Sequence, residues 1–284
     1  MSLSGDELFA AGRFDEAMAA YRQILAKDPA DAAARMGLDA ILERARTEQP
    51  NALLRELLLQ AYADDGANWE AVGWGAANQL LVGWPQDNDL AVLAADPLLR
   101  EFLRKSLNRD AALERRLIAL RRAVADALLA AEAPGEAIVA LADALAEQAW
   151  HNEYIWPDDA TVPDGPAAAM FRPSATPRAD VIEERRLAAE IPEIAPIIDA
   201  VSQSVAAMYE ANPYPRWTHL ARRPTVDVRA ALLHDFPHAA PVDFGDGPLQ
   251  VLMPGAGTGQ HPLTVASSYA GAQVPGVDLS RASL

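Results

Sequence analysis

The sequence contains no cysteine, and this absence excludes several kinds of site at once. Disulfide bonds, thiolate metal sites and cysteine nucleophiles all require the missing residue. Long apolar runs are missing as well, because no stretch approaches the roughly 18 consecutive apolar residues that a membrane helix needs. The N-terminal residues do not combine a basic start with an apolar stretch, so no signal peptide is expected. We therefore expect a cytoplasmic protein without a membrane partner.

Positive charge is also scarce. Lys and Arg total 24, against 40 Asp and Glu, which leaves a formal net charge of -16. A surface this acidic repels phosphate backbones, so nucleic acid is not expected as a partner. The apolar fraction of 51% is ordinary for a globular protein. A chain of 284 residues can therefore bury the core of one large domain or of two ordinary ones.

The first 47 residues predict a helical hairpin. Apolar residues recur there at three- and four-residue spacing, which gives a helix one apolar face. This expected face consists of Phe14, Ala17, Met18, Tyr21, Ile24 and Leu25. Asp28-Pro29 ends the helix, and Asp31 can cap the next one. The segment resembles a tetratricopeptide repeat, because it carries that family's glycine, small, aromatic and proline positions at Gly12, Ala17, Ala20, Tyr21 and Pro29.

The resemblance covers one repeat and part of a second, whereas stable arrays need about three repeats. A plain helical hairpin is the alternative. Either way, we expect residues 48–156 to continue as a helical domain, with helix starts at Asp96-Pro97 and Asp110. Residues 157–180 contain five prolines and predict a linker. The helical region is the expected binding surface for a protein or peptide partner.

The last 36 residues predict a different architecture. Leu249–Met253 reads as a buried strand, and Gly255, Gly257 and Gly259 follow it directly. A helix then opens at His261-Pro262 and stops at Gly271, and a second strand ends at Asp278. This order of elements, a strand, a glycine loop, a helix and a second strand that ends in an acid, predicts a βαβ unit. In such units the acid accepts hydrogen bonds from ribose hydroxyls. The dinucleotide pattern G-x-G-x-x-G is broken, because the glycines are spaced G-x-G-x-G and Pro262 follows.

The stretches "VLMPGAGTGQHPLTVA" and "VPGVDLS" resemble class I S-adenosylmethionine-dependent methyltransferases. With "HNEYIWPDD" and "YEANPYPRW", the chain is similar to bacterial proteins that join tetratricopeptide-like helices to such a domain. The resemblance implies that residues 181–284 are the N-terminal part of a doubly wound, Rossmann-like fold that binds S-adenosyl-L-methionine. It implies a cofactor-binding set of Gly255, Ala256, Gly257, Gly259, Asp278 and Leu279. The overall fold class expected is mainly α, with helices first and this βαβ unit last.

"YEANPYPRW" also offers candidates for a lid over the cofactor or the substrate. They are Tyr209, Asn212, Tyr214 and Arg216, with Trp217 beside them. The Asn-Pro-Tyr-Pro stretch is not expected to be the catalytic turn of amino-methyltransferases, because the preceding residues have helical rather than strand period. The alternative is a proline-stiffened connector with its aromatic residues in the core. His234 and His238 are not expected to bind metal, since Pro237 separates them.

Two hypotheses for function follow. In the first, the protein is an S-adenosylmethionine-dependent methyltransferase whose helical region recruits a substrate or partner. The class I fold needs more strands than the two seen here, so we expect the chain to be part of a longer enzyme and inactive alone. No catalytic residue is identified. In the second, the protein is a protein-interaction module with a vestigial or regulatory cofactor motif. The open edge of a two-stranded sheet further predicts a homodimer through the strands.

Overall fold

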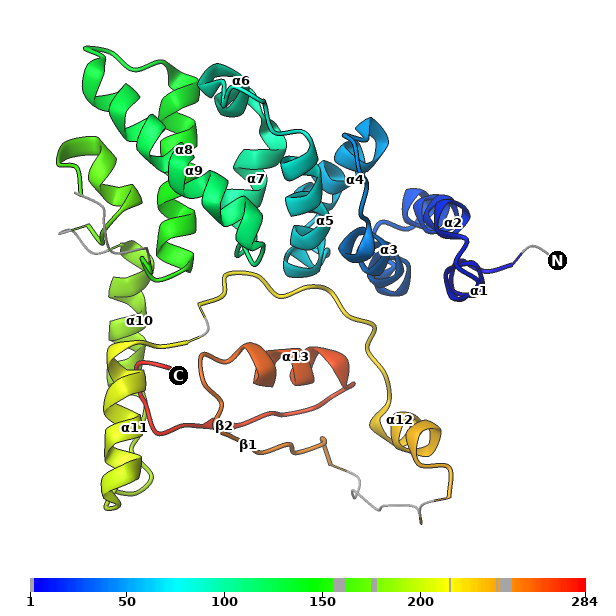
Figure 1. Ribbon diagram of the computed structural model, residues 1–284. Helices are drawn as coiled ribbons and strands as arrows, with labels where there is room; N and C mark the ends of the chain where they lie inside the picture. Colours follow the sequence, from blue (N-terminus) through cyan, green and yellow to red (C-terminus); the bar gives the residue numbers. More distant parts are fainter. Residues whose placement is uncertain (1–2, 156–161, 175–177, 215, 239, 241–246) are drawn as a thin grey trace. The chain divides into compact units, whose positions relative to one another are not determined.

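The computed structural model describes most of the chain, and its contacts divide it into two units (Figure 1). The N-terminal unit spans Met1–Ala175 and the C-terminal unit Thr176–Leu284. The chain is mainly helical, which confirms that part of the expected fold class. The structure describes residues 3–155, 162–174, 178–214, 216–238, 240 and 247–284.

The N-terminal unit is built from helices with polar caps. Asp31, Asp96 and Asp110 each accept a backbone N–H at a helix start, as their positions in the sequence predict. The helices are α1 (Gly5–Ala10), α2 (Phe14–Lys27), α3 (Ala32–Arg44), α4 (Ala52–Ala63), α5 (Trp69–Val82), α6 (Leu90–Ala95), α7 (Pro97–Lys105), α8 (Ala111–Ala130), α9 (Glu136–His151) and the 3-10 helix η1 (Gly165–Met170).

Tyr21 organises the first three helices. Its ring lies so close to Gly5 of α1 and Gly37 of α3 that a Cβ on either residue would come within 2.5 Å and 2.3 Å of it. The hydroxyl donates to Asp6 at 2.6 Å. The face that α2 buries consists of Ala17, Tyr21 and Leu25, at four-residue spacing. The expectation that Phe14 and Ile24 belong to this buried face is wrong. They are 47% and 38% exposed. Phe14 contacts Phe9 of α1 at the margin of this face and does not enter the core.

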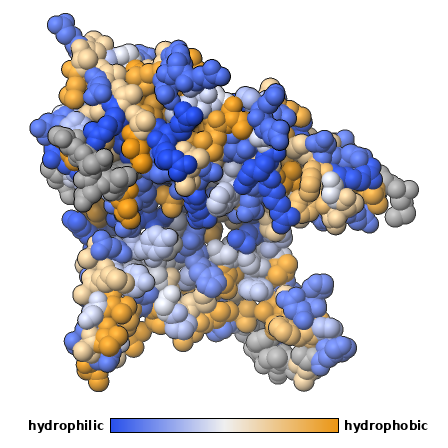
Figure 2. Space-filling view, in the orientation of Figure 1, coloured by the Kyte–Doolittle hydropathy of each residue, from blue (hydrophilic) through white to orange (hydrophobic). Residues whose placement is uncertain are grey.

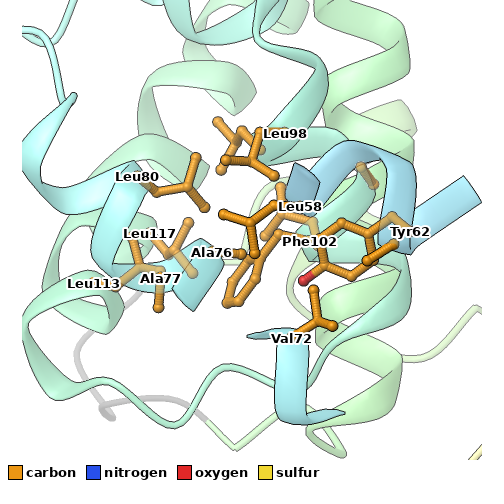
Figure 3. Packing of buried hydrophobic residues seen from close by; sticks show 14 of the residues in the cluster. Leu58, Tyr62, Val72, Ala76, Ala77, Leu80, Leu98, Phe102, Leu113 and Leu117 are labelled. Carbon is orange, nitrogen blue, oxygen red and sulfur yellow. The ribbon is translucent and has the colours of Figure 1, made fainter. Parts of the chain in front are cut away.

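The main core lies among α4, α5, α7 and α8. Figure 3 shows Leu58, Phe102 and Leu117 packed together there, with Tyr62 beside them. The Tyr62 hydroxyl is buried and lies 2.8 Å from the Ser106 hydroxyl, so its polar end is hydrogen-bonded. Gly75 brings α5 onto the backbone of α3, since a Cβ there would lie 2.2 Å from the carbonyl oxygen of Leu42.

The segment expected as a linker contributes to this unit. Residues 157–161 and 175–177 lie outside the described residues, but Gly165–Met170 forms η1. Ala167, Met170 and Phe171 are buried in the same core, where η1 packs against α8 and α9. Small and apolar residues after the prolines therefore fill a space on the helical bundle.

The C-terminal unit contains a short parallel strand pair with a helix between its strands. β1 (Met253–Pro254) pairs with β2 (Gly276–Val277), with Met253 opposite Gly276. The helices are α10 (Ala179–Glu190), α11 (Ala200–Ala211), α12 (Val228–Asp235) and α13 (Gln260–Ser268). None of α10, α11 or α12 has a buried residue. Figure 2 shows apolar atoms at the lower left, over the start of α11, where Ile198 and Val201 are exposed.

These strands are shorter and more exposed than predicted. Pro275 accepts the Met253 N–H at 2.9 Å but has no N–H to donate to the Val251 carbonyl oxygen, so the ladder loses one bond there. Leu252 is 63% exposed, which corrects the expectation of a buried strand. Within the described ranges the sheet has two strands, so the larger doubly wound sheet remains a prediction.

Asp39 is a charged group buried where α3 meets the start of α5. It is 3% exposed. One carboxylate oxygen accepts the Asn68 N–H at 2.6 Å, and Arg35, one turn earlier, pairs with Asp64. Burial raises the pKa of Asp39 from 3.8 to about 6, and the Asn68 bond and Arg35 offset only part of this increase.

We predict that Asp39→Asn stabilises the protein at alkaline pH. The folded pKa lies above the unfolded one, so the stability due to the protonated carboxyl is complete below about pH 4 and is lost as pH rises through 6. Asparagine keeps an acceptor for Asn68 without a charge. Between pH 4 and pH 8, wild type should lose about 2 kcal/mol more unfolding free energy than the variant does. Urea unfolding at both pH values measures this, with exposed Asp65→Asn as control, and equal losses would contradict it.

We also predict dimerisation through the edge of β1. No strand pairs with that edge in the part of the chain that the structure describes, and exposed Leu252 flanks it. Such an edge recruits another strand, whereas a charge beside it prevents pairing. Leu252→Asp should weaken the dimer at least about ten-fold in sedimentation equilibrium, an effect of about 1.4 kcal/mol. Leu129→Asp, on an exposed position of α8, is the control. A monomeric wild type would contradict the prediction.

Candidate functional site

A cavity of about 700 Å³ lies within the C-terminal unit. The glycine loop after β1, the end of β2, the start of α13 and the end of α11 all contribute to it. It brings together most of the residues predicted for the cofactor site and two of the predicted lid residues. Those that line it are Gly255, Ala256, Gly257, Asp278, Leu279, Tyr209 and Tyr214.

Backbone conformation explains the glycines of the loop. Gly255, Gly257 and Gly259 have φ values of 69°, 55° and 84°. Residues with a Cβ rarely adopt such conformations. Gly259 does not line the cavity and instead forms the N-cap of α13, so its contribution is to turn the chain into that helix. Gly276 lies close to Ala256: a Cβ added to Gly276 would come within 2.8 Å of the Ala256 Cβ atom. Small residues at both positions let the loop lie against β2.

Asp278 joins the loop to the end of β2. One carboxylate oxygen accepts the Gly257 N–H at 2.8 Å, and the other accepts the Ser280 N–H at 3.0 Å. A carboxylate has about four acceptor positions, so two remain for a ligand. The acid is thus held in one orientation at the cavity while keeping capacity for hydroxyl groups.

The end of α11 and the connector after it supply an aromatic wall. Tyr209 and Tyr214 line the cavity with Val205, and Tyr214 is 61% exposed. Asn212 and Arg216, the other two predicted lid residues, are not among the described lining residues. Trp217 donates its indole N–H to the Thr258 carbonyl oxygen at 2.8 Å, which ties this connector to the glycine loop. Pro215 lies outside the described residues.

Sequence reasoning missed Glu210. One of its carboxylate oxygens accepts from the Ser280 hydroxyl at 2.9 Å and from the Ala282 N–H at 3.1 Å. Glu210 and Ser280 are 70 residues apart, and no local pattern links them. Val205, Gln260 and His261 were also missed as lining residues, because a helix position alone does not tell which cavity a side chain reaches. Ser283, in the turn after β2, was missed as well.

The charge of the cavity is negative. Among the described residues that line it, Asp278 is an acid, and none is lysine or arginine. Within the described ranges, no group of three His, Asp or Glu side chains is placed to hold an ion. His234 lies in the last turn of α12, and His238 follows after the helix has ended.

Comparison with known proteins identifies the N-terminal segment. A family model described as "Tetratricopeptide repeat" matches residues 3–38, which comprise α1, α2 and the first half of α3. The tetratricopeptide resemblance is therefore confirmed there. Searches of the curated proteins and of the solved structures found no significant match. In the described ranges, no helix is long and apolar enough to cross a membrane. The methyltransferase resemblance of the C-terminal unit remains a prediction.

Proposed function

We propose that this protein joins a protein-interaction unit to a unit that binds S-adenosyl-L-methionine. The similarity of residues 3–38 to a tetratricopeptide repeat supports the first part, because such repeats stack helices into surfaces for protein partners. Exposed Phe14 supports it further. Phe14 packs against Phe9 with ring centroids 5.7 Å apart, and the Arg44 guanidinium lies 5.3 Å from the Phe9 ring. Phe9, Phe14 and Arg44 form an aromatic–arginine cluster of the composition found in binding hot spots.

We predict that Phe14→Ser weakens partner binding. The protein captures its partners from extract of the source cells, and mass spectrometry quantifies them. Loss of a hot-spot aromatic should reduce their enrichment about ten-fold or more. Leu129→Ser, also exposed but outside residues 3–38, is the matched control and should retain them. Circular dichroism checks that both variants keep their helices. Equal enrichment with both variants would contradict the assignment of this surface.

The second part rests on one observation: Asp278, held by the Gly257 N–H, faces a cavity together with the glycine loop. An acid at the end of the second strand of a βαβ unit accepts hydrogen bonds from ribose hydroxyls. The cavity volume of about 700 Å³ lies within the usual range for a small-molecule site. The resemblance to class I methyltransferases supports the same assignment for Gly255, Ala256, Gly257 and Leu279.

The charge of the cavity favours this cofactor over phosphate-bearing nucleotides. A pyrophosphate needs cations or a free helix N-terminus, and the described lining residues include no lysine or arginine. Pro262 in the first turn of α13 removes one of the helix's N–H donors. S-adenosyl-L-methionine carries no phosphate and has a positively charged sulfonium, which an acid and two tyrosine rings can accommodate.

We further propose methyl transfer as the reaction of this site, on the strength of the resemblance alone. The competing hypothesis keeps the cofactor site as a regulatory element of an interaction module. The two hypotheses differ in what happens to bound partners. A regulatory site would change the affinity of this chain for a captured partner when S-adenosyl-L-methionine is added. Transfer of a labelled methyl group to that partner, which would support the enzyme, is assayed with the longer enzyme that the resemblance implies.

We predict that Asp278→Ala weakens S-adenosyl-L-methionine binding by about 1–3 kcal/mol, the effect of removing a charged hydrogen-bond partner. Asp278→Asn retains an acceptor for Gly257 and should lose less. Isothermal titration calorimetry measures both, with exposed Glu184→Ala of α10 as control. ATP and NAD should give no heat of binding. Unchanged affinity in Asp278→Ala would mean that another residue holds the ribose, and a wild type that binds only ATP or NAD would refute the cofactor assignment.

A further inference from the structure

Glu210 connects two parts of the C-terminal unit that are distant in sequence. It is the penultimate residue of α11, next to Tyr209 of the aromatic wall. A single oxygen of its carboxylate accepts both the Ser280 hydroxyl and the Ala282 N–H, at 2.9 Å and 3.1 Å. Ser280 is only 1% exposed, and its hydroxyl also accepts the Ser283 N–H at 3.2 Å. The turn after β2 is therefore organised around this carboxylate.

The same turn holds the ribose acid. Ser280 donates its N–H to Asp278, and Asp278 in turn accepts the Gly257 N–H. Hydrogen bonds thus run without a break from Glu210 through Ser280 and Asp278 to the glycine loop. The helix that carries Tyr209 and the acid that faces the cavity are parts of one network.

Hydrogen bonds are needed to fix the position of α11, because its apolar packing is weak. α11 has no buried residue, so burial alone does not fix its position. Two described hydrogen bonds flank Tyr214 in the sequence and hold the aromatic wall. Before it, Glu210 accepts from Ser280 in the turn after β2, and after it, Trp217 donates to the Thr258 carbonyl oxygen. Arg281 of the turn also pairs with Glu193, before α11, at 3.6 Å, but both groups are largely exposed. Glu210 instead bonds to Ser280, whose N–H donates to Asp278.

We propose that Glu210 is a positioning residue of the cavity. It holds the end of α11, and with it the aromatic wall, against the turn after β2. Closure of the cavity is thereby coupled to the orientation of Asp278. The role in cofactor binding rests on the proposed function. The tether itself is a property of the unliganded protein, and it can be tested without any ligand.

The first experiment is hydrogen exchange of the unliganded full chain. Glu210→Ala removes both bonds, so amides of residues 278–284 and of α11 should exchange about ten-fold faster or more, as expected when local opening becomes easier. Glu210→Gln keeps a carbonyl acceptor but loses the charge, so its exchange should be intermediate. Glu184→Ala, an exposed glutamate of α10, should match wild type. Unchanged exchange in Glu210→Ala would refute the tether.

The second experiment measures S-adenosyl-L-methionine binding by calorimetry and its dissociation rate by stopped flow. Glu210→Ala should raise Kd about five-fold or more, mainly through faster dissociation. Combined with Asp278→Asn, its effect should be less than additive, because both substitutions break one network. Faster exchange with unchanged Kd would refute the positioning role. A wild type that binds no S-adenosyl-L-methionine would refute the proposed function, and the exchange experiment would still decide the tether.

Discussion

The hydrogen bond from the Gly257 N–H to Asp278 is the contact on which the C-terminal unit depends. β1 and β2 pair over only two residues each, and the ladder lacks the bond that Pro275 cannot donate. So short a ladder does not by itself fix the loop that follows β1. Asp278 fixes it from the other strand, and the small residues Ala256 and Gly276 let the two segments approach. The same carboxylate then serves as the acid of the cavity.

The N-terminal unit is held together by a different kind of interaction. Its helices bury a continuous set of leucines and aromatic residues, and Tyr21 occupies space that Gly5 and Gly37 leave open. An apolar core of this kind resists local opening. In the C-terminal unit, by contrast, α10, α11 and α12 bury no residue, so single hydrogen bonds carry more of the structure.

This contrast gives the two proposals different support. The proposed interaction unit has a family match over residues 3–38 and a cluster of Phe9, Phe14 and Arg44, in which Phe14 is exposed. The cofactor site has a cavity with one acid and no lysine or arginine among its described lining residues, which favours a ligand without phosphate. Partner binding and cofactor binding are separable in the experiments above, so either function can stand if the other fails.

The sequence by itself determined the helices and the identity of the loop residues. Periodicity and caps such as Asp31, Asp96 and Asp110 act within a few residues, and the glycine spacing reflects a local need for positive φ. Tertiary structure decided which side chains meet. Phe14 matches the period of the α2 core face yet is exposed, and Glu210 reaches Ser280 across 70 residues. Such contacts depend on how elements pack, and the local sequence of α2 or α11 does not encode its neighbours.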